Sequence, residues 1–218
     1  MTDDPRQHSP AAERNRGPIL AELQRLLPAH GVALEIASGT GQHAAFFAAG
    51  LPGWQWLPSD PEPHALASIA AWCAGSVNVL APIALDVMSP EWHGAAQPAD
   101  ALFCANMLHI APWATCAGLM QGAARHLAAN GLLLLYGPYL VEGEPVAPGN
   151  TAFDADLRAR NPAWGLRRLA DVLVQAEAAG LRLRERVQMP ANNLLLVLQR
   201  VKASPSAAAR AAPDRRHR

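Results

Sequence analysis

The stretch Val32 to Ala45, VALEIASGTGQHAA, constrains the fold of this chain more than any other. Its first five residues form a short apolar run that is typical of a buried strand. Gly39 and Gly41 then interrupt the pattern, and residues 42–48 have the composition of a helix. Glycine lets the backbone approach a ligand where a Cβ would clash, and the first N–H groups of a helix have no partner inside it. The sequence therefore predicts a strand, a tight turn and a helix that together form a ligand-binding corner.

Glu35, near the end of the predicted strand, bears on the kind of ligand. A dinucleotide corner requires G-x-G-x-x-G, and here Ala44 takes the third position. A carboxylate just before the loop would repel a pyrophosphate but suits a ligand with a cationic group, such as the ammonium of S-adenosylmethionine (SAM). Glu35 to Gly41 resembles the acidic-x-Gly/Ala-x-Gly-x-Gly pattern of SAM-dependent methyltransferases, with Ala37 in the place of the first glycine. A glycine turn with a purely structural role is the alternative.

Composition limits the other classes of function. The chain has 218 residues, of which 50% are hydrophobic, and a formal net charge of zero, so we expect one core and no general attraction to nucleic acid or membranes. The three cysteines (Cys73, Cys104, Cys116) lack CxxC spacing, which is typical of reduced, structural thiols. No apolar run approaches the roughly 20 residues that a membrane span needs, and the N-terminus lacks a secretory apolar segment. These features predict a cytoplasmic protein with a small-molecule partner, and they leave its oligomeric state open.

The order of elements predicts an α/β protein with a single doubly wound, mostly parallel seven-stranded sheet and an antiparallel C-terminal hairpin. The resemblance of residues 35–41 to the methyltransferase pattern implies that this sheet is of the Rossmann-like class I methyltransferase type. We expect disordered tails at 1–13 and 201–218 around one domain at 14–200. Expected strands cover 32–36, 54–60, 79–85, 99–104 and 131–136, with a closing antiparallel pair at 181–187 and 193–200. Expected helices cover 14–27, 42–48, 64–73, 113–129 and 163–179.

Polar residues follow the carboxyl ends of these strands, where ligands bind in such sheets. Asp60 ends the second strand about twenty residues after the glycines, where an acid reaches the hydroxyls of a ribose. Asp86 ends the third strand beside Val87 and would meet an adenine. Both acids also suit plain helix or loop caps. Because an acid at position 60 serves NAD as well as SAM, Glu35 is the residue that separates the two cofactors.

Several further motifs resemble one group, the methyltransferase-like protein 26 family. The matching segments are Arg14-Asn15, Leu34 to His43, Pro58 to Asp60, Asn106 to Ile110 with Pro112-Trp113, Tyr136 to Tyr139, Asn150, Phe153-Asp154, Leu157-Arg158, Trp164-Gly165 and Met189 to Asn193. The resemblance implies a class I SAM-dependent methyltransferase fold with SAM as cofactor. The residues assigned to the cofactor are Glu35, Ala37, Ser38, Gly39, Thr40, Gly41, Asp60, Asp86, Val87 and Asn106. The chain departs from the family at Gly149, where serine is usual, and at Arg168, where an acid is common.

The remaining candidates lie near the expected reaction centre. Asn106 and His109 follow the fourth strand, and an imidazole there could remove a proton from a nucleophile or serve as a structural hydrogen-bonding group. His43 is either packed or a ligand contact. The residues assigned to a substrate are Asn15, Tyr136, Tyr139, Asn150, Asp154, Arg158, Trp164, Asn192 and Asn193. No His, Cys, Asp or Glu cluster has metal-ligand spacing, so we expect no metal site.

Three functions are compatible with these residues. The first is an enzyme that transfers the SAM methyl group to a small-molecule acceptor. The second is a non-catalytic module that binds SAM or S-adenosylhomocysteine (SAH) and has no acceptor pocket. The third is an NAD(P)-dependent oxidoreductase, which the carboxylate of Glu35 disfavours.

Overall fold

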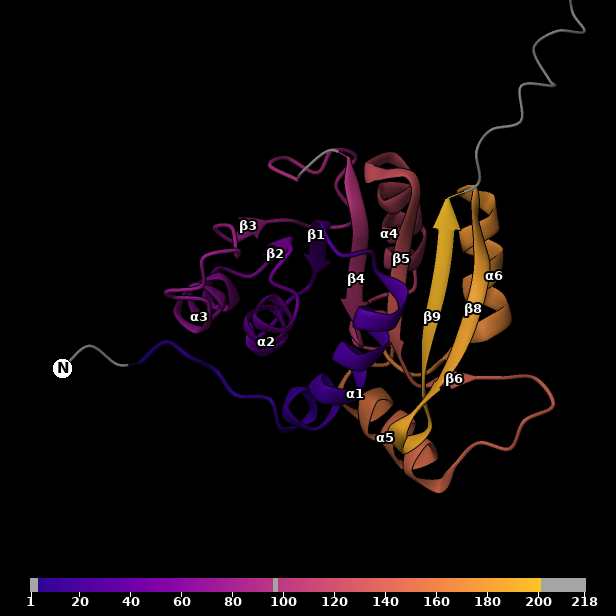
Figure 1. Cartoon of the computed structure of the whole chain (residues 1–218). Coiled ribbons are helices and arrows are strands. Elements are labelled where there is room, and N and C mark those ends of the chain that lie inside the picture. The colour runs from indigo at the N-terminus through magenta and orange to yellow at the C-terminus, as the bar shows by residue number, and fades with distance from the viewer. Residues whose placement is uncertain (1–3, 96–97, 201–218) are drawn as a thin grey trace, which may run out of the picture.

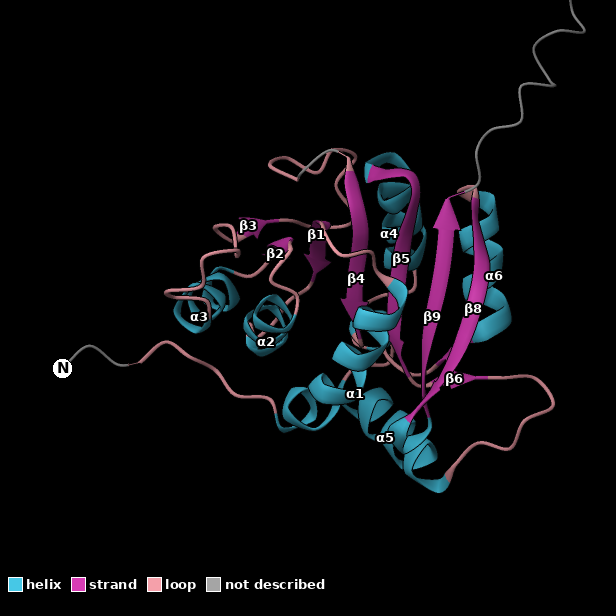
Figure 2. Ribbon diagram, in the orientation of Figure 1, coloured by secondary structure: helices cyan, strands magenta, loops and turns pink. Residues whose placement is uncertain are grey.

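The computed structural model of the chain describes residues 4–95 and 98–200. Seven strands form one sheet in the order β3-β2-β1-β4-β5-β9-β8, and only β9 runs antiparallel to its neighbours (Figures 1 and 2). These strands are β1 (Gly31–Ile36), β2 (Trp54–Asp60), β3 (Ile83–Ala84), β4 (Ala99–Ala105), β5 (Leu127–Gly137), β8 (Leu181–Met189) and β9 (Asn193–Arg200). The helices are α1 (Pro10–Leu26), α2 (Gln42–Gly50), α3 (Pro63–Trp72), α4 (Ala114–His126), α5 (Pro148–Arg160) and α6 (Leu169–Ala178), with short 3₁₀ turns η1 (Met107–His109) and η2 (Pro190–Asn192). A two-stranded ladder joins β6 (Tyr139–Leu140) to β7 (Arg167–Arg168).

The sheet separates two apolar cores because successive strand residues point to opposite faces. Leu34 and Ile36 of β1 face the core that contains α4 and α6, whereas Ala33 faces the core that contains α1, α2 and α3. The central strands are buried on both sides, as in other parallel sheets. This three-layer arrangement confirms the predicted fold class, and it brings the carboxyl ends of β1, β2, β4 and β5 to one edge.

Several element boundaries differ from the prediction. The expected third strand shrinks to Ile83–Ala84 because Pro82 cannot donate to a ladder, and the expected helix at 163–179 begins only at Leu169. Gly165, with φ 136°, lies in a conformation that a helix cannot contain. The segment between β6 and β7, for which the sequence analysis gives no element, contains helix α5. This helix has only Leu157 buried, so its sequence lacks a strong apolar stripe.

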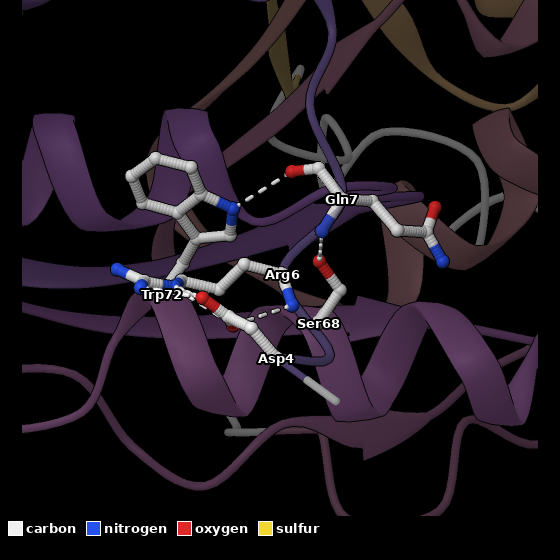
Figure 3. Close-up of polar contacts among 5 residues, drawn as sticks. All are labelled: Asp4, Arg6, Gln7, Ser68 and Trp72. Atoms are coloured by element: carbon white, nitrogen blue, oxygen red, sulfur yellow. Dashed lines mark hydrogen bonds and ion pairs between the residues drawn. The ribbon is translucent and has the colours of Figure 1, made fainter. Parts of the chain in front are cut away.

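The N-terminal segment is ordered from residue 4, which corrects the expected disorder up to residue 13 as far as the described residues reach. Ser9 caps α1, and its hydroxyl accepts from the Ala12 N–H. Figure 3 shows Gln7 bound to α3: its N–H donates to Ser68 Oγ (2.8 Å), and its carbonyl accepts from Trp72 Nε1 (2.8 Å). The Arg6 guanidinium lies 5.6 Å from the centroid of the Trp72 ring. The expected C-terminal tail at 201–218 lies outside the described residues.

Candidate functional site

The glycine corner has the conformation that its sequence predicts. Gly39 and Gly41 have φ of +56° and +87°, a region that favours glycine. A Cβ at Gly39 would meet no atom within 4 Å, whereas a Cβ at Gly41 would lie 2.6 Å from Ile69 Cα. Gly41 therefore lets α2 pack against α3, and Gly39 leaves an open surface at the end of β1. An open, glycine-lined turn at a helix N-terminus fits the cofactor that the fold implies.

Asp60 links the corner to the end of β2. One carboxylate oxygen accepts from the Gly39 N–H (3.0 Å) and the other accepts from the Glu62 N–H (3.0 Å). The side chain is 6% exposed. Asp60 thus caps the turn that leads into α3 and also lies against the glycine turn, and its contact with a ribose stays a prediction. Carboxylate oxygens accept more than one hydrogen bond each, so they retain capacity for hydroxyl groups of a ligand.

The polar side chains of the N-terminal segment continue into the same corner. Ser68 Oγ, which accepts from Gln7, donates to the carbonyl of Thr40 (2.7 Å). The Ser9 N–H donates to Gln42 Oε1 (2.5 Å), and Gln42 Nε2 donates to Glu13 (3.2 Å). The segment before α1 therefore helps to fix the glycine turn, which the sequence analysis did not anticipate.

Glu35 lies beneath the corner, which corrects its predicted contact with a cationic ligand group. Its side chain is 2% exposed, and Oε2 accepts from the indole N–H of Trp56 (2.6 Å). Burial raises the pKa of Glu35 from its ordinary 4.5 to about 8. Glu35 therefore supports the corner from inside the sheet rather than presenting a charge at its surface.

Glu35→Gln is expected to make the stability of the protein less sensitive to pH between 6.5 and 8. Because the pKa is higher in the folded state than in the unfolded chain, the contribution of Glu35 is full below pH 4.5 and falls as pH rises toward 8. The wild-type protein should lose on the order of 1.5 kcal/mol relative to Glu35→Gln across this window. The buried His43 and His109 have a folded pKa of about 4 and take up a proton near pH 6.5 only in the unfolded chain, but this contribution is common to both proteins and cancels in the comparison. Urea unfolding of both proteins at pH 6.5 and 8.0 measures the difference. If the free energy of unfolding changes by the same amount in both proteins between these pH values, Glu35 is not protonated in the folded protein.

Asp86 and Val87 follow β3, where the Leu85 N–H donates to the Asp60 carbonyl (3.3 Å). Asp86 is exposed, and one of its carboxylate oxygens accepts from the Met88 N–H (2.8 Å), which is the loop cap that the sequence left as the alternative. Val87 is buried within the core that contains α4. Of the three acids, the structure brings Glu35 and Asp60 to one corner and leaves Asp86 as a cap after β3.

A pocket of about 590 Å³ opens beside the corner, at the ends of β4 and β5. Its walls come from α1, α5 and η2. The lining residues are Ala11, Arg14, Asn15, Pro18, Asn106, Tyr136, Pro138, Gly149, Asn150, Phe153, Pro190, Ala191, Asn192 and Asn193. The structure thus brings together six of the residues predicted from the sequence: Asn15, Asn106, Tyr136, Asn150, Asn192 and Asn193. The volume is within the usual range for small-molecule sites.

His43 connects the corner to this pocket. Burial lowers the pKa of His43 to about 4, so its imidazole is neutral near pH 7. Its Nε2 lies 2.7 Å from Asn15 Oδ1, and since this oxygen carries no proton, Nε2–H is the donor. Asn15 and Tyr136 both line the pocket. His43 is therefore a positioning residue for Asn15.

His109 lies behind the pocket rather than in it. Its ring is 0% exposed, and neither ring nitrogen has a hydrogen-bond partner among the residues that the structure describes. The ring packs against Tyr139, with centroids 5.2 Å apart, and Nε2 faces Gly137 so closely that a Cβ there would lie 2.4 Å away. Burial lowers the pKa of His109 to about 4. This packing favours the structural alternative over the predicted general base.

Four other predicted substrate residues lie outside this pocket, and their assignment to a substrate stays a prediction. Asp154 accepts from Arg158 Nε (2.8 Å) and from the Leu166 N–H (2.7 Å), so it ties α5 to the chain before β7. The guanidinium of Arg160 lies 5.3 Å from the ring centroid of Trp164. Tyr139 is buried beside His109. These side chains hold the pocket wall in place from behind.

The sequence analysis also missed residues. Arg14 and Phe153 line the pocket, although they were quoted only as parts of motifs. The available signal was that Arg14 precedes Asn15 on the same helix. Arg167 was likewise given no role, but its guanidinium donates to the carbonyls of Leu108, Ala111 and Ala163 (2.7–2.8 Å). It therefore fixes the segment after β4 that carries Asn106 and His109.

The structure also bears on metal binding and on membrane association. Within residues 4–95 and 98–200, no three His, Cys, Asp or Glu side chains are grouped so that they could hold a metal ion. Over the same residues, no helix combines the length and the hydrophobicity of a membrane span. The three cysteines are buried and unpaired with one another.

The strand order and the glycine turn define the Rossmann-like class I methyltransferase fold, and comparison with solved structures confirms this. The mitomycin 7-O-methyltransferase MmcR superposes with a TM-score of 0.75 over 88% of this chain and 54% of its own, at 15% identity. An O-methyltransferase family 2 protein from Planctomyces limnophilus in complex with apigenin gives 0.72 over 88% and 58%, at 20% identity. The SAH-bound CalO1, a methyltransferase in calicheamicin biosynthesis, gives 0.67 over 84% and 54%, at 21% identity. This chain therefore spans little more than half the length of these structures.

Residues 6–200 match one family model, and the chain belongs to that family, DUF938, which is described as a protein of unknown function. The resemblance to the methyltransferase-like protein 26 family stays a prediction.

Proposed function

We propose that this protein is a SAM-dependent methyltransferase that acts on a small-molecule acceptor. The observation that carries the proposal is the pairing of two sites at one sheet edge. An open glycine turn, fixed by Asp60, lies at the ends of β1 and β2, and a separate pocket of about 590 Å³ lies at the ends of β4 and β5. A group-transfer enzyme needs a donor site and an acceptor site side by side, whereas a binding module needs only the first.

In this proposal Ser38 to Gly41 and Asp60 hold the cofactor. The turn offers backbone N–H groups, and Asp60 accepts from the ribose hydroxyls while its bond to Gly39 keeps the turn in place. When bound, SAM supplies a methyl group that its sulfonium already makes electrophilic. The protein then chiefly aligns donor and acceptor, which can lower the barrier by roughly 7–11 kcal/mol.

The acceptor-side residues line the pocket. Asn106 directly follows β4 and has φ 60°, a strained conformation for a non-glycine residue. Asn15, held by His43, and Tyr136 line the same pocket. In the proposal these three side chains position the acceptor. The fold neighbours named as O-methyltransferases support the choice of methyl transfer and of a small-molecule acceptor.

Asp60→Asn is expected to weaken binding of SAH by about tenfold, because a ribose hydroxyl loses a charged acceptor and the turn loses its anchor. Glu177→Gln on α6, an exposed acid on the opposite side of the sheet from α2 and α3, is the matched control and should bind as the wild type does. Calorimetric titration with SAM, SAH, NAD and NADP measures the affinities. Tighter binding of NAD or NADP than of SAH would overturn the choice of cofactor.

Transfer itself is tested by incubating the wild-type protein with methyl-labelled SAM and a whole-cell metabolite extract. The expected result is a labelled small molecule whose formation requires the protein and falls with Asp60→Asn. Saturable SAH binding without any labelled product would identify a binding module instead.

A further inference from the structure

The pocket beside the corner carries an uncompensated positive charge. Arg14 is the one charged residue in its lining, which contains no aspartate or glutamate. Among the residues that the structure describes, Arg14 has no acidic side chain within 4.0 Å, whereas its neighbour Arg16 pairs with Glu13. A guanidinium at the wall of a largely apolar pocket attracts an anion, and its planar donors match a carboxylate.

Tyr136 adds a neutral donor. It lines the pocket, and burial raises the pKa of its hydroxyl above the ordinary value of 10, so the hydroxyl keeps its proton at neutral pH. This proton is therefore available to a ligand oxygen in the pocket.

Two asparagines of the pocket use their side-chain amides for hydrogen bonds within the pocket wall. Asn150 Nδ2 donates to the carbonyl of Asn192 (3.0 Å), and Asn193 Nδ2 donates to the carbonyls of Pro190 and Ala191 (3.0 and 3.3 Å). These bonds hold the η2 turn, in which Ala191 and Asn192 have φ near +57°. The amide donors of Asn150 and Asn193 therefore shape the wall and do not compete with Arg14 for a ligand.

The rest of the lining is apolar. Phe153, which is 37% exposed, and the prolines Pro18 and Pro138 offer flat surfaces with no charge. A ligand that satisfies the whole pocket combines an anionic group for Arg14 with a flat apolar body.

We infer that this pocket binds a carboxylate-bearing acceptor, with Arg14 pairing with the carboxylate and Tyr136 donating to one of its oxygens. The inference rests on the proposed function, and it names the substrate class: an acid with a flat, ring-containing body. The carboxylate is the anchor, so the methyl-accepting atom lies elsewhere on the ring.

A second carboxylate is available in such an enzyme, at the amino-acid end of the cofactor. The pocket lining favours the acceptor, because it includes α5 and η2 and excludes Ala37 to Gly41 and Asp60. The two sources are separated by measuring the affinity for SAH and the affinity for an acceptor-like acid in the same variants.

The test uses 6-hydroxy-2-naphthoate and its neutral counterpart 6-hydroxy-2-naphthamide, titrated calorimetrically into the full chain with and without saturating SAH. The wild type should bind the acid about tenfold more tightly than the amide, a difference of about 1.4 kcal/mol. Arg14→Gln should reduce this preference to within about twofold and leave the affinity for SAH unchanged. Arg182→Gln on the exposed face of β8 is the control and should retain the preference.

Each other outcome contradicts the inference. Equal binding of acid and amide by the wild type, or no binding of the acid at millimolar concentration, would show that the pocket does not select a carboxylate-bearing acceptor. A loss of SAH affinity in Arg14→Gln with the preference intact assigns Arg14 to the cofactor. Failure of the proposed function is distinguishable, because the wild type would then not bind SAH while the acid titration without SAH still reports on Arg14.

Discussion

Gly41→Ala is expected to lower the free energy of unfolding by about 2–5 kcal/mol. Two costs combine at this position. The φ of +87° disfavours any residue with a Cβ, by roughly 1–2 kcal/mol. The new Cβ would also lie 2.6 Å from Ile69 Cα, a backbone atom of α3 that cannot rotate away, and forced overpacking costs roughly 1–3 kcal/mol. Since domains of this kind are stable by about 5–15 kcal/mol, the loss is a large fraction of the total, and urea unfolding measures it directly.

Gly39→Ala is the matched variant, two residues earlier in the same turn. Its φ of +56° gives a similar backbone cost, but its Cβ would meet no protein atom within 4 Å. We therefore expect a loss of only about 1–2 kcal/mol in stability, together with a clear loss of SAH affinity, because the methyl group fills the open surface proposed for the cofactor. Equal destabilisation by the two variants, or normal SAH binding by Gly39→Ala, would contradict the division of roles within the turn.

The contrast between these glycines shows what the sequence made predictable. The fold and the glycine corner could be predicted because their signals are local in the sequence. These signals are the apolar run before Gly39, the alternation of side chains along the strands and the acid at position 60. The order of elements then admits few topologies, and the class I arrangement was predicted correctly. The same rules located the ends of β2 and β9 to the residue.

The side-chain assignments were less predictable because they depend on contacts between distant segments. Nothing near Glu35 in the sequence indicates that Trp56, 21 residues away, would take up its carboxylate. Asp154 and Arg158 are four residues apart and form an ion pair on α5, a helix that the composition did not reveal. Arg14 reaches the pocket only because α1 packs across the sheet edge, a tertiary event without a local signal.

The hydrogen bonds from Arg167 to three backbone carbonyls are the strongest example of such a tertiary contact. It is the first residue of β7, yet its guanidinium lies over the segment that follows β4, 56–59 residues earlier in the chain. Backbone atoms strengthen the connection, since the Gly165 N–H donates to the carbonyl of His109 (2.9 Å). The Asn106 end of the pocket is therefore held by residues from the other half of the molecule.

Arg167→Ala is expected to destabilise the protein by about 3 kcal/mol. The carbonyls of Leu108, Ala111 and Ala163 lose a charged donor. The bonds to Leu108 and Ala111 are partly buried, and a buried acceptor left without a partner costs roughly 1–3 kcal/mol. Arg167→Lys keeps the charge but not the planar set of donors, so its stability should lie between those of the wild type and Arg167→Ala. The adjacent Arg168→Ala, at an exposed position, should change stability by less than about 0.5 kcal/mol.

The same variants connect stability to the pocket. Once the segment after β4 is released, Asn106 and the ring of His109 lose their fixed positions, so Arg167→Ala should weaken the binding of an acceptor acid while SAH, held at the ends of β1 and β2, binds nearly as before. Urea unfolding and the two titrations at a temperature where all variants are folded provide the measurements. If the free energy of unfolding of Arg167→Ala lies within about 1 kcal/mol of the wild-type value, then the three carbonyls find other partners. The position of Asn106 in the pocket then does not depend on this guanidinium.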